Sequence, residues 1–129
     1  MHSQIELRST RSLDNADETE LPLIDQSIMS DWCNDLEKED VLAILSSVPD
    51  EVKRSLADLR KAVGARDLAS ARRTAHRLKG MANNLGAVRL GRMARDIELT
   101  SHSIEDVSAR LATLEQTMGK TLEALRSYC

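Results

Sequence analysis

Residues 41–63 read VLAILSSVPDEVKRSLADLRKAV, and their apolar positions recur in alternating steps of three and four. Such spacing is typical of an amphipathic α-helix with one apolar stripe. The stripe consists of Val41, Leu45, Val48, Val52, Leu56, Leu59 and Val63. Pro49 interrupts it, and a proline inside a helix costs about 3 kcal/mol and usually kinks or restarts the helix. Because the stripe keeps its phase across Pro49, we expect a kink or a brief break, with both halves packed on the same core.

Similar stripes lie on both sides of this segment. Asp25 is the expected N-cap of a short first helix, and Gly64 and Asp67 provide a stop and a new N-cap before a helix over 68–84 that ends at Gly86. The remaining stripes are Ile24, Ile28, Trp32 and Leu36 in the first helix, Leu90, Met93, Ala94 and Ile97 in the fourth, and Val107, Leu111, Leu114, Met118, Leu122 and Leu125 in the last. The pattern predicts an all-α fold, an antiparallel up-down four-helix bundle with a short additional N-terminal helix.

The composition agrees with a helical domain. Apolar residues make up 41% of the 129 residues and aromatic residues only 2%, and no run alternates with period two, so we expect no strands. Residues 1–20 are polar and carry no stripe, which predicts a flexible leader before a domain over residues 21–129.

The sequence also bears on the compartment. No apolar stretch is long enough for a signal peptide or a membrane span, so we expect a soluble, cytoplasmic protein. Cys33 and Cys129 do not suggest a disulfide framework, and we expect Cys33 to be a small buried apolar residue and Cys129 a free thiol. The initiating Met1 and the short leader favour a stand-alone protein.

Positive charge is concentrated in one segment. Residues 66–95 contain eight Arg or Lys and one acid, Asp67, although the whole chain has a net charge of −3. A basic segment in an acidic protein suggests an anionic partner or ligand. A solvated helix face that happens to use arginine is the alternative.

The outer face of the 68–84 helix carries the candidate chemistry. With Ala75 and Leu78 facing the core, helical spacing surrounds His76 with Arg72, Arg73, Lys79, Gly80 and Asn83, so His76 is not a core histidine. Imidazole has a pKa of about 6.5, so much of it is neutral at cytoplasmic pH and can act as a nucleophile. Lys79 lies one turn away and can attract an anion held on the ring. Phosphoryl transfer depends mainly on such positioning and charge stabilisation.

Gly80 stands in mid-helix, where alanine would be more stable by roughly 1 kcal/mol. Helical side chains lean toward the N-terminus, so a side chain at position 80 would cover the turn that bears His76. We therefore interpret Gly80 as clearance beside the imidazole. Close helix packing or a tolerated defect is the alternative.

These residues resemble a known family. The run His76-Arg77-Leu78-Lys79-Gly80, followed by Leu85-Gly86-Ala87 and later by Ala94 and Ile97-Glu98, looks like the signature of histidine-containing phosphotransfer (HPt) domains. The resemblance covers roughly residues 21–128. It implies a four-helix bundle in which His76 accepts a phosphoryl group, Lys79 stabilises that group and Gly80 keeps the face open. Arg77 is bulkier than the small residue that often follows the histidine, and this difference could tune partner choice.

The resemblance also implies which partners the protein binds and which activities it lacks. The partners would be response-regulator receiver domains and a hybrid sensor histidine kinase, and the protein would be a phosphocarrier without kinase activity. We expect no cofactor, with Mg²⁺ only on the partner receiver, and a monomer. The expected docking residues are Arg72, Arg73, Arg77, Met81 and Asn83.

Two other readings are weaker. Residues 78–97 resemble a helix-turn-helix, but a position that should be apolar is Arg92, and the acidic remainder of the chain opposes nucleic-acid binding. A structural bundle without phosphotransfer is the other alternative. Histidines 2, 76 and 102 are too scattered to suggest a metal site.

Overall fold

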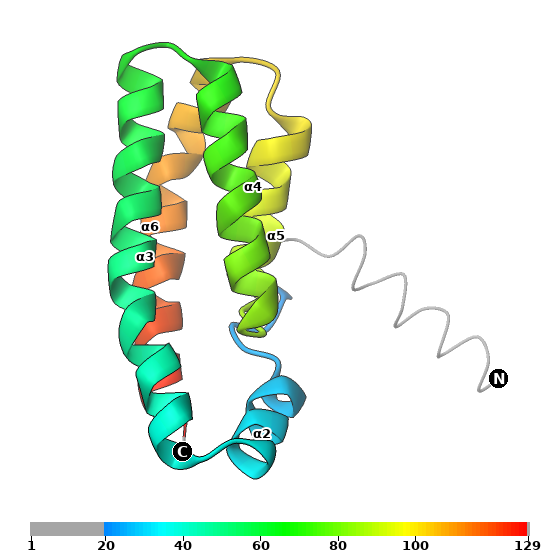
Figure 1. Ribbon diagram of the computed structural model, residues 1–129. Helices are drawn as coiled ribbons and strands as arrows, with labels where there is room; N and C mark the ends of the chain where they lie inside the picture. The colour runs from blue at the N-terminus through cyan, green and yellow to red at the C-terminus, as the bar shows by residue number, and fades with distance from the viewer. Residues whose placement is uncertain (1–19, 129) are drawn as a thin grey trace, which may run out of the picture.

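The computed structural model describes residues 20–128 and is all-helical over that range, as predicted. Figure 1 shows the five helices, which are α2 (Gln26–Asp35), α3 (Lys38–Gly64), α4 (Leu68–Asn84), α5 (Val88–Thr100) and α6 (Ile104–Arg126). No strand occurs among these residues. The expected leader, apart from Glu20, lies outside the described residues.

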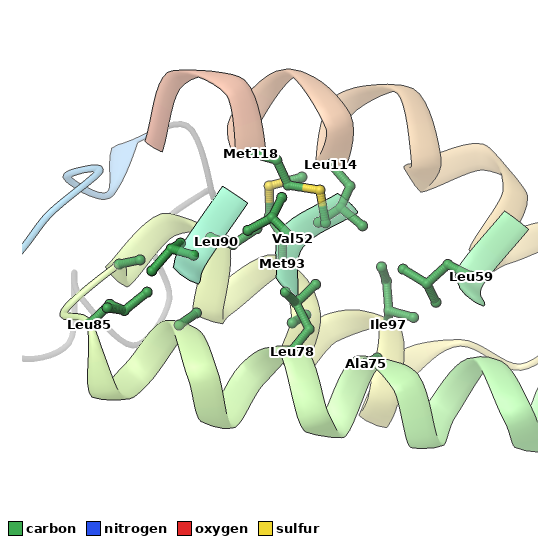
Figure 2. Close-up of a cluster of buried hydrophobic side chains, with 14 of the residues drawn as sticks. Val52, Leu59, Ala75, Leu78, Leu85, Leu90, Met93, Ile97, Leu114 and Met118 are labelled. Carbon is green, nitrogen blue, oxygen red and sulfur yellow. The ribbon is translucent and has the colours of Figure 1, made fainter. Parts of the chain in front are cut away.

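The four long helices enclose one core. α3 contacts α4 and α6, and α5 contacts the same two helices, while the shorter α2 contacts α3 near one end of the bundle (Figure 1). Figure 2 shows the apolar side chains between them, among which Leu59, Leu78, Ile97 and Leu114 are almost fully buried. Burial of such side chains is the main favourable contribution to folding.

The predicted stripes supply this core with one correction. In α3, Val41, Val48, Val52 and Leu59 are buried, and the other stripe positions are half-buried. The stripe proposed for the first helix is partly wrong, because Met29 is its buried residue and Leu36 lies beyond the helix with 40% of its surface exposed. A helix of only ten residues shows too few turns for the pattern to fix its inner face.

Polar caps and turn residues set the ends of α4. Asp67 is its N-cap and accepts a hydrogen bond from the Ser70 N–H at 3.0 Å, as predicted. Gly86 follows α4 with φ of 71°, a left-handed conformation that favours glycine. At the turn between α3 and α4, the left-handed residue is Arg66 with φ of 55°, whereas Gly64 is the last residue of α3.

α3 is one continuous helix through Pro49, so of the expected kink or brief break, the break is absent. Proline removes one backbone N–H from the helix, so the turn before it loses a hydrogen bond. Val48 and Val52 are both buried, so core packing holds the helix on both sides of the proline. Burial of the apolar stripe on both sides of Pro49 thus stabilises the helix by more than the lost hydrogen bond costs.

The first-helix cysteine differs from expectation. Cys33 is exposed on α2 and disulfide-bonded, so its prediction as a small buried apolar residue is wrong. Cys129, the other cysteine of the chain, lies outside the described residues. Over the described range, no helix is both long enough and apolar enough to span a membrane.

Candidate functional site

His76 lies on the outer face of α4. Its side chain is 68% exposed, whereas the neighbouring Ala75 and Leu78 are fully buried. The prediction that His76 is not a core histidine is therefore confirmed. Its imidazole is therefore accessible to a partner protein from the solvent side.

Glu98 of α5 joins His76 to Lys79. One carboxylate oxygen, Oε2, lies 2.5 Å from His76 Nδ1, and the other, Oε1, accepts a hydrogen bond from Lys79 Nζ at 2.8 Å. The Glu98 side chain is only 17% exposed. The three residues form a network in which one carboxylate holds the histidine ring and the lysine side chain in fixed relative positions.

The electrostatics of this network fix the proton on His76. The hydrogen bond from Lys79 is the largest influence that holds the pKa of Glu98 below its usual value, with a further contribution from His76, while burial acts in the opposite direction. An ionised carboxylate can only accept hydrogen bonds, so His76 Nδ1 is the donor. In the neutral ring the unprotonated nitrogen is then Nε2, which leaves its lone pair available.

Glu98 belongs to the family signature, but the sequence alone assigns it no role. Glu98 is 22 residues from His76 in the chain, and the contact depends on how closely α4 and α5 approach. α4 and α5 are close near Gly91, where an added Cβ would lie 3.6 Å from Ala82 Cβ and 2.5 Å from the movable side-chain oxygen of Asn83. The available signal was the Ile97-Glu98 pair of the family signature.

Gly80 has open space around it. A Cβ built there would meet nothing within 4 Å, and the residue is exposed. The alternative that Gly80 permits close helix packing is therefore wrong. Its missing side chain leaves the surface beside His76 uncovered.

Half of the basic segment is neutralised within the molecule. The ion pairs join Arg66 to Glu105, Arg77 to Asp58, Lys79 to Glu98 and Arg92 to Asp96. All four acids lie outside residues 66–95 in sequence. The excess of positive charge therefore requires an anionic partner less strongly than the sequence suggested.

The expected docking residues lie on two sides of α4, one facing α5 and the other facing α3. Arg72 donates to the Ser101 carbonyl after α5, and Asn83 is exposed beside Gly91 of the same helix. The other three residues face α3. Arg73 and Arg77 line one hollow between α3 and α4, and Met81 lines another.

Most of the residues that line the hollow at Met81 are apolar, and Ser47, Glu51 and Asn84 complete its lining. It measures about 650 Å³, and its apolar lining comes from α2, α3 and the end of α4, namely Trp32, Ile44, Val48, Met81 and Leu85. Ile44 is 37% exposed, which is unusual for a large apolar side chain in a core helix. We call this site the apolar hollow.

The described residues hold no group of three histidine, cysteine or acidic side chains that could bind a metal ion. His102 is exposed, and its backbone N–H donates to Asp106 at 2.8 Å. His2 lies outside the described residues.

Comparison with protein families identifies the chain. The family model for the Hpt domain matches residues 43–128, which is most of the chain, and the chain therefore belongs to the Hpt domain family. Hpt domains are phosphocarrier modules that interact with receiver domains in phosphorelays. The match begins inside α3 and leaves α2 outside it. Searches of curated proteins and of solved structures found no significant match.

Proposed function

We propose that this protein accepts a phosphoryl group on His76 from the phosphorylated aspartate of one receiver domain and passes it to another. The observation that carries the proposal is the Glu98 network: an exposed imidazole is held at Nδ1, and Lys79 is fixed beside it. A solvated helix face would not require a carboxylate that is only 17% exposed and that binds both the imidazole and the ammonium group.

The proposed step balances as a displacement at phosphorus. The lone pair on His76 Nε2 forms the N–P bond, the bond between phosphorus and the receiver's aspartyl oxygen breaks, and the aspartate leaves as a carboxylate. The ring then carries positive charge, which the Glu98 carboxylate at Nδ1 stabilises. Transfer to a second receiver is the reverse step with another aspartate.

Lys79 acts on the transferred group. Its ammonium is held 2.8 Å from Glu98, one helical turn from His76, so its charge lies close to the oxygens that the phosphoryl group brings. Fixed positive charge near those oxygens favours the transition state. Glu98 is a positioning residue here, because it acts through the imidazole and the lysine.

The role of Glu98 has its own test. In Glu98→Gln, the amide can either donate to Nδ1 or accept from it, so the tautomer of His76 is no longer fixed. Nitrogen-15 NMR of the imidazole should report one tautomer with protonated Nδ1 in the wild type and a mixture in the variant. A wild-type spectrum dominated by protonated Nε2 would refute this role.

The proposed docking surface for the receiver consists of Gly80 and residues on both sides of it. We propose that the receiver covers Gly80 and inserts apolar side chains into the apolar hollow, with Met81 at its edge. Arg73 and Arg77 contact the receiver from the α3 side, and Arg72 and Asn83 contact it from the α5 side.

The remaining features of the proposal follow from this carrier role. The phosphate originates from a hybrid sensor histidine kinase, the protein has no kinase activity of its own, and Mg²⁺ is needed only by the receiver. We propose a monomer that binds neither membranes nor nucleic acid. The domain spans residues 21–129 and is an antiparallel up-down four-helix bundle, with α2 as an additional helix.

We place the protein in the cytoplasm, where kinases have access to ATP. Disulfides are rare in that compartment, so the Cys33 disulfide should be reduced there. Thiol alkylation and mass spectrometry of protein from rapidly quenched cells would test this, since persistent protection of Cys33 would contradict it.

The proposed function is tested by radiolabelled transfer from a panel of phosphorylated receivers to the wild type and to His76→Gln. We expect acid-labile, alkali-stable label on the wild type alone. Equal label on both proteins, or none from any receiver that binds, would refute the role of His76.

A further inference from the structure

A second hollow lies between α3 and α4. It measures about 450 Å³, and its polar lining includes Lys61, Arg73, Arg77 and Thr74. We call it the cationic hollow. It opens on the α3 side of α4, whereas Glu98 approaches His76 from α5.

The two carboxylates at the cationic hollow are already engaged. Asp58 accepts a hydrogen bond from Arg77 at 2.7 Å. Asp67 accepts from both the N–H and the hydroxyl of Ser70 as the N-cap of α4. Hydrogen bonds from Ser70 are the main cause of the lowered pKa of Asp67, and the charge of Arg73 contributes to the same shift. Neither acid forms an ion pair with Lys61 or Arg73.

Two cations in the cationic hollow make no ion pair. Within the described residues Lys61 makes no ion pair, and Arg73 donates only to the Ser70 hydroxyl at 2.8 Å. Thr74 is only 7% exposed, and its hydroxyl makes no hydrogen bond within the part of the chain that the structure describes. The Thr74 hydroxyl lines the hollow and is free to donate a hydrogen bond to a ligand. Together with two cations that make no ion pair, it favours an anionic ligand.

The cationic hollow lies close to His76 along α4. Arg73 precedes His76 by three residues on α4, which corresponds to about 4.5 Å along the helix axis. A protein that contacts His76 from the α3 side therefore also covers the hollow. At physiological salt, charges separated by less than about 8 Å still interact.

We propose that the cationic hollow binds one acidic side chain, Asp or Glu, that a receiver presents beside its phosphorylated aspartate, and that this contact selects among receivers. The inference rests on the proposed phosphotransfer function. The net excess in the hollow is one positive charge, which suits a single carboxylate. A free phosphate dianion would instead meet Asp58 and Asp67 in an open, solvated groove.

Charge reversal tests the selection. Lys61→Glu, Arg73→Glu and the double variant are compared with Lys120→Glu, a matched charge change on an exposed position of α6. Initial rates of transfer are measured from a panel of phosphorylated receivers, after circular dichroism has verified folding. With the preferred receiver at low salt, we expect the double variant to be about tenfold slower and Lys120→Glu to be unchanged.

Two further experiments, at high salt and with a charge-reversed receiver, test whether the contact is electrostatic. In about 1 M salt, where the Debye length is about 3 Å, the difference between the double variant and the wild type should fall below about twofold. Reversing the receiver's acidic residue to lysine should restore transfer to the double variant. These three results together would support a paired electrostatic contact.

Several outcomes would overturn the inference. Unchanged transfer by the double variant with every receiver would do so, as would an equal loss in Lys120→Glu. Calorimetric binding of inorganic phosphate that the double variant loses, with transfer unaffected, would assign the hollow to a free anion instead. If the wild type accepts phosphate from no receiver, the proposed function itself fails, whereas normal wild-type transfer with insensitive variants refutes only this inference.

Discussion

The Gly80→Ala substitution adds one methyl group to the exposed face of α4. A Cβ at this position meets nothing within 4 Å, so the folded protein gains no steric clash. Alanine is favoured over glycine in a helix interior by about 0.8–1.0 kcal/mol. The variant should therefore be more stable than the wild type by close to that amount, which corresponds to a rise in Tm of about 4 °C for a domain of this size.

The same methyl group should slow phosphotransfer. It leans toward the turn that carries His76, where the receiver's phosphorylated aspartate must approach to bonding distance. A misplacement of about 1 Å at a reacting centre can cost as much as a hundredfold in rate, so we expect a loss of about tenfold to a hundredfold. Stability and activity should thus change in opposite directions.

Gly119→Ala is the matched control for this experiment. Gly119 is exposed within α6 and also has nothing within 4 Å of an added Cβ. Thermal unfolding should show a similar gain in stability for both variants, while single-turnover transfer from a phosphorylated receiver should slow only in Gly80→Ala. Normal transfer by Gly80→Ala, or an equal loss in Gly119→Ala, would refute the clearance argument.

Three further predictions concern stability. Asp67→Ala removes the acceptor for the Ser70 N–H and should cost about 1 kcal/mol in urea unfolding, and an unchanged midpoint would contradict the capping role. Gly86→Ala places a Cβ at a left-handed residue, 3.1 Å from Ile28 Cβ, and should lower the free energy of unfolding by about 1–2 kcal/mol, whereas a rise in Tm would disprove it. The pKa of Glu98 is lowered in the folded state, so its contribution to stability is present above its usual pKa of 4.5 and is lost as the pH falls below that value. The difference in unfolding free energy between the wild type and Glu98→Gln should accordingly shrink from pH 6 to pH 3 in urea titrations, and a difference that grows would contradict the assigned ionisation.

The helices could be predicted because their signals are local. The bounds of α4 at residues 68 and 84 follow from an apolar period, the Asp67 cap and Gly86, all read within one short segment. The α2 stripe was less certain because ten residues provide fewer than three turns. The continuity of α3 through Pro49 could not be predicted, because it depends on core packing that offsets the local cost of a proline in a helix.

The site could be predicted only where it lies on one helix. Spacing along α4 places His76, Lys79 and Gly80 on a common outer face without any tertiary information. Glu98 was missed because its contact with His76 arises from the packing of α5 on α4. The strength of the basic segment was overestimated for the same reason, since Asp58 and Glu98 reach it from other helices.

The most direct test of the account is the location of the phosphoryl group within the imidazole of His76. Nitrogen-15-labelled protein, phosphorylated by a receiver and kept at alkaline pH, can be examined by phosphorus-coupled NMR of the histidine ring. Because Glu98 holds the proton on Nδ1, the account predicts phosphorus coupled to Nε2 of His76. Phosphorus on Nδ1, or on any other residue, would contradict it.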